Sequence, residues 1–436
     1  MELKPIQKQT KPAPPRSRIR KFFAALGPGL VTGGADDDPS GIVTYSQTGA
    51  QFGLGQLWLA VFMLPFLVAV QEMSARIGIV TRRGIAAIIK EHYPRWILYV
   101  IVFILFVANT INLGADLGAM ADSAQLIYNL PPLVYLILFF AVILLLEIFL
   151  TYRKYARILK WLTISLFAYF ITGFIVSSNW PEILRATFLP HIQFNFDFFL
   201  IITAVLGTTI SPYLFFWQAS QEVEEEDQET AAPRFKRSKF LANMRIDTFV
   251  GMLFSEVSTW FIILTSAAVL HNHGILNIST AAQAASALQP LVHSFPHSGK
   301  IAEILFSAGI IGTGFLAIPI FAASSSYAVA EIFQWKEGLS KTFNQAKSFY
   351  VVIILGSLVG LLINLIGISP FKALIYAAVL NGFVSVPIIF ILIRISGSKK
   401  IMAENASGNL SKFFSWLTFI AMFLAALFTV YSFFIK

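Results

Sequence analysis

The sequence contains no cysteine and few charged residues for its length. Among its 436 residues cysteine is absent, and only 13% are Asp, Glu, Lys or Arg. Without thiols, neither a disulfide framework nor a thiolate metal cluster can form. A soluble globular domain usually carries about 25% charged residues. The composition therefore excludes an ordinary soluble enzyme.

Hydrophobic residues make up 56% of the chain, and 42 of them are phenylalanine. They are concentrated in long runs that are nearly free of charge, and roughly 20 such residues span a bilayer as a helix. We therefore predict an all-α integral membrane protein embedded in a lipid bilayer, with about eleven transmembrane helices. The predicted spans lie near residues 27–50, 54–80, 97–128, 131–151, 155–178, 198–220, 241–270, 299–330, 349–367, 371–395 and 412–435.

The formal net charge of +9 comes from basic residues that lie between the hydrophobic runs. Alternate loops are rich in Lys and Arg while the loops between them are poor, which is the pattern of the positive-inside rule. This pattern predicts a multi-pass protein of the cell (plasma) membrane with a cytoplasmic N-terminus and, from the odd number of spans, an external C-terminus. It gives no reason to expect a nucleic-acid partner. The predicted cytoplasmic groups are Arg82, Arg83, Lys90 and Arg95; Arg153, Lys154, Arg157 and Lys160; Arg234, Lys236, Arg237 and Lys239; Lys336, Lys341 and Lys347; and Arg394, Lys399 and Lys400.

The chain divides into a short tail and one large domain. Residues 1–24 are basic and proline-rich and lack the apolar core of a signal peptide, so we expect a disordered cytoplasmic tail. Residues 25–436 form a single predicted transmembrane domain. The motif GxxxxGK[ST] is absent, so no ATPase subunit is implied. A membrane hydrolase is the rival class, but the motifs HExxH and GxSxG are also absent, and we expect no enzyme and no cofactor.

Three consecutive carboxylates interrupt the first span, at Asp36, Asp37 and Asp38, and Pro39 follows them. A charge in the middle of a membrane costs about 2.5 to 3.5 kcal/mol even on a lenient scale, so three of them require a compensating partner. Proline also breaks a helix and frees backbone carbonyl groups. Carboxylates with free carbonyls suit a hard cation. The alternative is that these residues cap a helix that starts just after an interfacial loop.

The sixth span has a similar interruption, with Gly207, Thr208, Ser211 and Pro212 near its centre. A proline kink is common in membrane helices, but two interrupted spans five helices apart are typical of a five-plus-five inverted repeat. We predict repeats at about residues 27–178 and 198–396 plus one extra helix. Helices 1 and 6 are broken at the middle of the membrane, and a cation site lies between the two breaks.

Several short patterns resemble the Nramp family of divalent metal transporters, whose fold is the LeuT-like inverted repeat. They are Gly27-Pro28 followed by Asp38-Pro39-Ser40-Gly41 in the first span, and Gln71-Glu72, Arg76-Ile77-Gly78 and Thr81-Arg82 in the second. The similarity extends from about residue 27 to 395. It implies that the transported substrate is a divalent cation and that Asp38 matches the family's metal-ligating aspartate.

Two departures from the family pattern fall on the metal site itself. Ser211-Pro212-Tyr213 stands where the family has Met-Pro-His, and Gly41 stands where it has asparagine. Thioether ligands favour softer transition metals, whereas oxygen and water favour Mg²⁺, Ca²⁺ and Mn²⁺. Mg²⁺ also tends to keep several waters when one or two carboxylates hold it. This combination resembles the Nramp-related magnesium transporter branch, so Mg²⁺ is the favoured ion, with Mn²⁺ as the second candidate.

Coupling to protons is also expected to differ from the family. Its third span carries Asp-Leu-Ala-Glu, and the matching residues here are Asn112-Leu113-Gly114-Ala115. Tyr213 replaces the family's histidine, and a tyrosine titrates near 10. We therefore expect passage without proton coupling, driven by the membrane potential. Asp116 and Asp122 leave a shifted register open, and the alternative function is a proton-coupled Mn²⁺ or Fe²⁺ importer of the ordinary Nramp type.

The predicted metal site combines side chains with backbone groups. Asp38 supplies a carboxylate, Ala35 and Thr208 supply carbonyls freed by the breaks, and Ser211 supplies a hydroxyl directly or through water. Gly41 contributes by being small. Asp37 is either a second carboxylate that faces the pocket or a group that binds water on the cytoplasmic side, whereas Asp36 is the least favoured contact.

Two further polar features have open interpretations. The acidic run formed by Glu222, Glu224, Glu225, Glu226 and Asp227 is either a solvated loop face, which is the favoured reading, or a means of concentrating cations at the inner mouth. Asn381 in the tenth span either lines the pathway or bonds to a neighbouring helix.

Overall fold

The computed structural model describes residues 27–149, 165–177, 179–229 and 237–435. Every regular element in these ranges is a helix, as predicted. The predicted disordered tail lies outside the described residues. So do the basic residues Arg153, Lys154, Arg157 and Lys160 of one predicted cytoplasmic loop, and Arg234 and Lys236 of the next.

The predicted spans are found as helices in the described chain. Nine spans are long and apolar enough to cross a membrane. They are α4 (Trp58–Thr81), α6 (Arg95–Ile127), α7 (Pro132–Phe149), α11 with α12 (Phe196–Thr209 and Pro212–Glu229), α13 (Arg237–Val269), α16 (Ser298–Phe333), α17 (Lys347–Ile363), α18 (Pro370–Ser396) and α20 (Asn409–Ile435). The first span is divided between α2 (Pro28–Asp36) and α3 (Pro39–Phe52), and α9 (Phe167–Val176) is the described part of the fifth.

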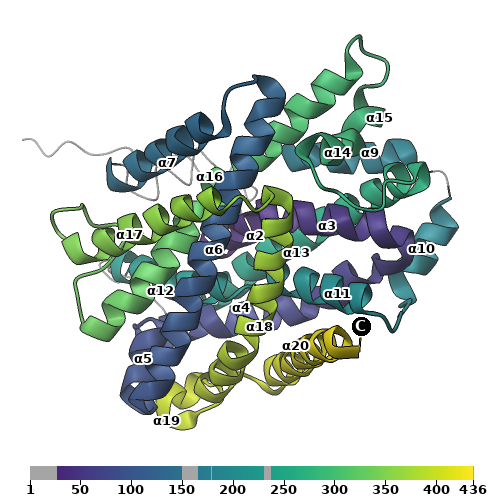
Figure 1. The fold of residues 1–436 in the computed structure, drawn as a ribbon. Coiled ribbons are helices and arrows are strands. Elements are labelled where there is room, and N and C mark those ends of the chain that lie inside the picture. Colours follow the sequence, from purple (N-terminus) through teal and green to yellow (C-terminus); the bar gives the residue numbers. More distant parts are fainter. Residues whose placement is uncertain (1–26, 150–164, 178, 230–236, 436) are drawn as a thin grey trace, which may run out of the picture.

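Short helices connect the spans or lie at their ends. They are α5 (Ile85–His92), α10 (Trp180–Phe188), α14 (Ala281–Ala285), α15 (Gln289–Val292) and α19 (Lys399–Met402), together with the 3₁₀ turns η1 (Gly53–Gln56), η3 (His271–His273), η4 (Ser286–Leu288), η5 (Asn364–Ile366) and η6 (Ala403–Asn405). Figure 1 shows α5 and α19 at one end of the molecule and α10 at the opposite end, near the C-terminus of α20.

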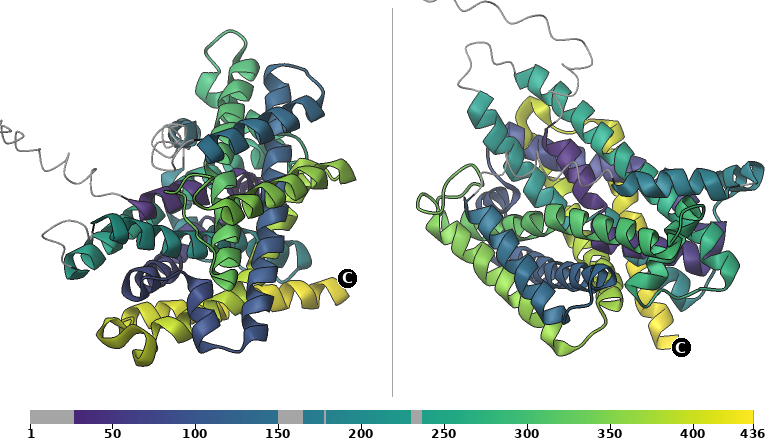
Figure 2. Two further views of the ribbon diagram at one scale, coloured as in Figure 1. Left: turned by 90° about the vertical axis from the view of Figure 1, so that its left-hand side faces the viewer. Right: turned by 90° about the horizontal axis from the view of Figure 1, so that it is seen from above.

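The two broken spans lie in the centre of the bundle. In Figure 1, α2 and α3 cross the middle of the molecule, and Figure 2 gives two further views of the same arrangement. α13 packs along both α2 and α3, while α11 packs against α18 and α12 against α4 and α16. By contrast, α7, α17 and α20 expose many large apolar side chains, as expected of helices that face lipid.

Proline sets the position of each break. α2 ends at Asp36 and α3 begins at Pro39, whose ring disfavours helical geometry in the residue before it. Asp38 has extended backbone geometry there, and its Oδ1 accepts a hydrogen bond from the backbone nitrogen of Gly41 at 2.7 Å. Asp38 is therefore an N-cap, but it caps a half-helix inside the span because α2 precedes it. The predicted break is confirmed.

The second break follows the same rule. α11 ends at Thr209, and α12 begins at Pro212, so Ile210 and Ser211 lie in the non-helical segment. The carbonyl of Ile210, which is left without a helical partner, accepts a hydrogen bond from the Ser385 hydroxyl of α18 at 2.6 Å. An unpaired carbonyl at this depth would cost several kcal/mol, so the neighbouring helix stabilises the break.

The backbones of α2 and α13 are in direct contact. A Cβ atom added to Gly33 would lie 2.1 Å from the carbonyl oxygen of Gly251, and one added to Gly251 would lie 2.1 Å from that of Gly29. Only glycine permits this approach, which is how small residues serve between membrane helices. α2 therefore packs closely against α13.

The acidic run after the sixth span is not a solvated loop. α12 continues as a helix to Glu229, and the side chains of Glu222 and Glu226 are buried. Arg82 pairs with Glu226 at 3.2 Å, and Glu224 accepts hydrogen bonds from Tyr327 and from the backbone nitrogens of Leu339 and Ser340. The solvated reading is wrong for these residues, because packing against α4 and α16 encloses one side of the helix.

Candidate functional site

Asp38 lies at the junction of the two breaks and is about 1% exposed. Its Oδ1 accepts hydrogen bonds from the Ser40 hydroxyl and the Gly41 backbone nitrogen, both at 2.7 Å. Its Oδ2 lies 3.4 Å from the hydroxyl of Tyr213. Three donors therefore fix the carboxylate in place, and the second oxygen is the less firmly bonded of the two.

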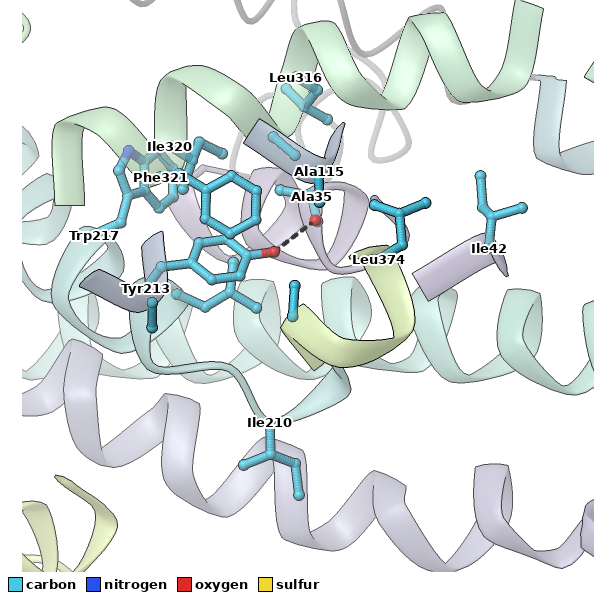
Figure 3. Packing of buried hydrophobic residues seen from close by; sticks show 14 of the residues in the cluster. Ala35, Ile42, Ala115, Ile210, Tyr213, Trp217, Leu316, Ile320, Phe321 and Leu374 are labelled. Carbon is cyan, nitrogen blue, oxygen red and sulfur yellow. Dashed lines mark hydrogen bonds between the residues drawn. The ribbon is translucent and has the colours of Figure 1, made fainter. Parts of the chain in front are cut away.

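Hydroxyl groups join the first break to the second. Ser40 and Thr208 share a hydrogen bond of 2.9 Å between their side-chain oxygens. The Tyr213 hydroxyl donates to the backbone carbonyl of Ala35 at 3.0 Å, a contact drawn in Figure 3, and its ring packs on Phe321 with 4.0 Å between ring centroids. The tertiary structure thus brings Asp38, Ala35 and Thr208 together, although Ser40 and Thr208 are 168 positions apart in sequence.

Ser211 belongs to the same region but directs its hydroxyl back to the end of α11. The Oγ atom lies 2.6 Å from the carbonyl oxygen of Gly207 and 2.7 Å from that of Thr208. The amide nitrogen of Asn381 approaches the same Oγ at 3.5 Å. The carbonyl of Thr208 therefore accepts a protein hydrogen bond in this conformation, as the carbonyl of Ala35 does.

Gly41 is closely surrounded. A Cβ atom at this position would lie 2.9 Å from the carbonyl oxygen of Asp36 and 3.5 Å from Oδ1 of Asp38. The backbone at the break occupies the space next to Gly41, so a larger residue requires this segment to move. The small size of Gly41 is needed for packing around Asp38 in the present conformation.

Asp36 and Asp37 face α13 and are completely buried. The Ser255 hydroxyl donates to Asp36, while neither side-chain oxygen of Asp37 has a hydrogen-bond partner within normal limits. Glu256 of α13 is buried with both carboxylate oxygens likewise unbonded, and it is close enough to Asp36 and Asp37 for electrostatic repulsion. These acids form a group beside Asp38, on the α13 side of the break.

Helix α6 brings another carboxylate close to Asp38. Asp116 of α6 is fully buried, neither of its oxygens is hydrogen-bonded, and it is close enough to Asp38 for the two charges to interact. One turn earlier on the same helix, Asn112 exchanges hydrogen bonds of 2.9 and 3.1 Å with Asn381. Asn381 therefore bonds to a neighbouring helix, as one of the two interpretations predicted, and it also lies next to Ser211 of the predicted site.

From the sequence, Asp116 was a candidate only if the third span matched the family in a shifted register, and Glu256 was not predicted to be near the site. The spacing of Asn112 and Asp116 was the available signal for the first, because residues four apart share one helix face. Met120, one further turn along, packs against Gly314 beside the ring of Pro39. No three His, Cys, Asp or Glu side chains of the described residues converge on one metal position. A cation here would need backbone oxygens or water as well as Asp38.

Contacts at both ends of the first span close the site. On one side, the carboxylate of Asp247 on α13 accepts hydrogen bonds from the backbone nitrogens of Gly29 and Leu30 at 2.7 and 3.1 Å, at the N-terminus of α2. On the other side, Gln47 of α3 accepts a bond of 2.8 Å from the backbone nitrogen of Ile278 and donates one of 3.1 Å to the carbonyl of Leu276. These contacts hold α2 and α3 against their neighbours in the conformation in which Asp38 is buried.

Comparison with known proteins decides the family. The family pattern described as natural resistance-associated macrophage protein-like, or Nramp, matches residues 29–432. The chain belongs to the Nramp family. Among curated relatives, the divalent metal cation transporter MntH of Caldanaerobacter subterraneus subsp. tengcongensis is 25% identical over 405 residues, which cover 90% of this chain and 89% of the relative. MntH of Bacillus subtilis (strain 168) is 23% identical over 420 residues, covering 94% and 92%.

Solved structures agree with this assignment of the fold. The Nramp chain superposes on the Eremococcus coleocola manganese transporter with a TM-score of 0.73 at 16% identity, covering 95% of this chain and 88% of that one. MhsT in complex with L-phenylalanine gives a TM-score of 0.62 at 12% identity, covering 93% and 98%. The predicted LeuT-like fold is confirmed, and because its relatives are transporters, so is the expectation of a transporter rather than an enzyme.

Proposed function

We propose that this Nramp-family chain is a divalent metal cation transporter that carries partly hydrated Mg²⁺ by alternating access without coupled proton movement. The observation that carries the proposal is the position of Asp38, a buried carboxylate at the meeting point of two broken helices. Broken helices that meet inside the membrane are where secondary transporters bind their substrates. The relatives named as divalent metal cation transporters support the class of substrate.

The donor atoms around Asp38 support a hard ion. Its neighbours are the hydroxyls of Ser40, Thr208 and Tyr213 and the carbonyl of Ala35, all of which are oxygen groups. Mg²⁺ prefers oxygen ligands and usually retains waters while few carboxylates bind it directly. A single fixed carboxylate with surrounding hydroxyls suits such a partly hydrated ion, since water molecules complete the shell.

The surrounding acids favour a positively charged substrate. Four more acids lie around Asp38: Asp36, Asp37, Asp116 and Glu256. Among the described residues, the charged groups that act on these five acids are other carboxylates, not Lys or Arg. A buried carboxylate without a counter-charge is costly, so these groups hold protons or attract a cation. A divalent cation that enters the site supplies the missing charge.

Asp116 is the observation that favours the alternative, a proton-coupled Mn²⁺ or Fe²⁺ importer. Its buried carboxylate beside Asp38 is in a position to take up a proton displaced by a metal. The proposal assigns Asp116 a different role, which is to add negative potential near the ion. The two roles predict different proton fluxes.

The first experiment measures uptake of Mg²⁺ and Mn²⁺ into proteoliposomes by the wild type and by Asp38→Asn. The substitution keeps the shape of the side chain and removes the charge, and transport of both ions is expected to fall at least about 100-fold, because a charged ligand to a buried ion is worth several kcal/mol. Asp122→Asn is the matched control. Asp122 lies near the end of α6, where its carboxylate accepts a hydrogen bond from the backbone nitrogen of Ala281 instead of facing Asp38. Equal uptake by wild type and Asp38→Asn would refute the site.

The second experiment measures the pH inside proteoliposomes during metal uptake. The proposal expects no metal-dependent acidification in the wild type and none in Asp116→Asn. Acidification that accompanies uptake in the wild type and is lost in Asp116→Asn would overturn the uncoupled mechanism and establish the alternative. A separate comparison of initial rates for Mg²⁺ and Mn²⁺ at equal concentration decides the preferred ion.

A further inference from the structure

A basic cavity lies far from the transport site, at the end of the bundle where α5 and α19 are found (Figure 1). Its volume is about 550 Å³. Five segments form it: the turn between α5 and α6, the end of α18, the turn that leads into α19, α19 itself and the start of α20. The cavity is lined by His92, Tyr93, Ile393, Arg394, Gly397, Ser398, Lys400, Ile401, Lys412 and Trp416.

The charge of this lining has one sign. Arg394, Lys400 and Lys412 supply three cations, and no carboxylate is among the lining residues. None of the ion pairs between described residues involves these three side chains. Like charges held around one cavity repel each other unless an anion lies between them. The cavity is therefore electrostatically complementary to an anion.

The lining also includes other side chains that can donate hydrogen bonds. Tyr93, Ser398 and His92 line the same cavity as the cations. Burial raises the pKa of the Tyr93 phenol above its usual range, and the nearby Arg394 guanidinium opposes that rise. The phenol is therefore protonated at neutral pH and able to donate. Several donors around a set of cations match the oxygens of a phosphate group.

The position of the cavity relates it to the membrane surface. α18, α20 and α6 are all membrane spans, and the cavity is formed where they end or begin. Trp416, which lines the cavity, packs on Phe390 and Phe419. Two neighbours of lining residues in the sequence are exposed aromatics: Trp96, three positions after Tyr93, and Phe413, next to Lys412. Aromatic residues of this kind mark the interface between hydrocarbon and headgroups. Apolar surface for acyl chains is thus adjacent to donors for a headgroup.

We propose that this cavity, formed by His92, Tyr93, Arg394, Ser398, Lys400 and Lys412, binds a phosphate group, and that its source is the headgroup of an anionic phospholipid. Basic cavities between membrane helices on the cytoplasmic side are suited to anionic headgroups, and the positive-inside pattern predicts that this end is cytoplasmic. The lipid joins α18 to α20 and to the turn before α6. The proposal is independent of the transported ion.

The test measures binding of short-chain phosphatidylglycerol to the purified full chain in detergent, with short-chain phosphatidylcholine and inorganic phosphate as separate arms. The variant Arg394→Gln/Lys400→Gln/Lys412→Gln removes the three cations. Each basic residue near a membrane surface contributes on the order of 1 kcal/mol, so phosphatidylglycerol is expected to bind the variant at least about ten-fold more weakly than the wild type. Phosphatidylcholine is expected to bind neither protein saturably.

The matched control is Lys239→Gln/Lys336→Gln/Lys347→Gln, which removes three exposed cations that do not line the cavity. An equal loss in this control would overturn the proposal, since the effect would then be general attraction to a basic surface. Absence of saturable phosphatidylglycerol binding to the wild type would overturn it as well. Inorganic phosphate that binds as tightly as the lipid, and only when the three cations are present, would support the phosphate site and refute the lipid as its source.

Loss of folding in the triple variant is separated from loss of binding by a second substitution. Lys400 is exposed on the short helix α19, so Lys400→Gln alone is expected to leave the elution volume on size exclusion unchanged. It should weaken phosphatidylglycerol binding by a smaller factor in the same direction. Unchanged affinity in a folded Lys400→Gln variant, together with unchanged affinity in a folded Lys412→Gln variant, would contradict the proposal.

Discussion

The hydroxyl of Tyr213 donates a hydrogen bond to the backbone carbonyl of Ala35, and so connects α12 directly to the end of α2. The same oxygen lies 3.4 Å from Oδ2 of Asp38. Tyr213 therefore contacts two of the groups that we predict to bind the metal. If these groups bind the metal as proposed, the phenol must give up its contacts with them when the ion enters.

Removal of that hydroxyl should change stability and metal affinity in opposite directions. In Tyr213→Phe the carbonyl of Ala35 loses its donor, and an unpaired buried acceptor costs about 1–3 kcal/mol, so the melting temperature without metal should fall. The freed oxygens should bind Mg²⁺ more tightly, which is seen as a lower KM for uptake and a larger stabilisation by Mg²⁺. A variant with unchanged KM and unchanged response to Mg²⁺ would show that Tyr213 does not contact the ion's site.

Ser211→Met tests the selectivity of the site. A thioether at this position offers a soft ligand, so uptake of Mn²⁺ and Cd²⁺ relative to Mg²⁺ should rise by about ten-fold. The control is Ser211→Ala, which removes the hydroxyl without adding sulfur and should not favour the softer ions. Initial rates in proteoliposomes with each ion separately give the ratio. If Ser211→Met and Ser211→Ala show the same ratio, the residue does not select the ion.

Gly41 should not tolerate the asparagine that stands at the matching position in the family. The added Cβ would lie 2.9 Å from the Asp36 carbonyl and next to the Asp38 carboxylate, so the break must shift to accept it. We expect Gly41→Asn to lower the melting temperature by an amount corresponding to about 1–3 kcal/mol, as overpacking usually does. Gly41→Ala should show most of the same loss, because the conflict begins at Cβ. Full stability in both variants would mean that the break is flexible here.

Asp247 should control how readily the site opens toward the side of the α2 N-terminus. Its carboxylate accepts two backbone hydrogen bonds there, a charged interaction that also matches the positive end of the helix. Asp247→Asn weakens both effects, and α2 should then separate from α13 more often. The measure is the labelling rate of a cysteine introduced at Thr32, which is buried in α2. The chain has no native cysteine to react in its place. A labelling rate equal to that of the unsubstituted reporter protein contradicts this role.

The loop between α16 and α17 should make stability depend on pH. Burial, with the negative charges of Glu331 and Glu224 nearby, raises the pKa of Glu337 to about 9, although Lys341 opposes the rise. The folded protein therefore keeps a proton that the unfolded chain releases above its usual pKa. Stability from this group is present at low pH and declines as the pH rises toward 9. Melting temperature measured from pH 5 to 9 should fall less steeply in Glu337→Gln than in the wild type.

The sequence alone determined the class of protein, the spans and the two breaks. These features depend on local chemistry: a run of apolar residues is long enough to cross a bilayer or it is not, and Pro39 and Pro212 each follow glycine, hydroxyl or carboxylate residues that disfavour a helix. Proline alone does not decide the matter, because Pro65, Pro319 and Pro387 lie inside continuous helices. The sequence also predicted a carboxylate at the first break, and Asp38 is buried there; its role in binding a metal stays a prediction. It did not identify the burial of Glu222 and Glu226, since a charged run by itself does not show what packs against it.

Only the tertiary structure decided which distant groups meet at the site. Tyr213 bonds to Ala35, Asp116 lies near Asp38, and Asp247 caps α2. These contacts form because helices far apart in sequence pack against each other at these positions along their axes. Helical periodicity gives the face of each residue but not the neighbour of that face or its register along the membrane normal. The basic cavity has the same origin, since five segments that are individually unremarkable supply its lining. Local patterns thus fixed where the helices break, and packing between helices decided what surrounds the breaks.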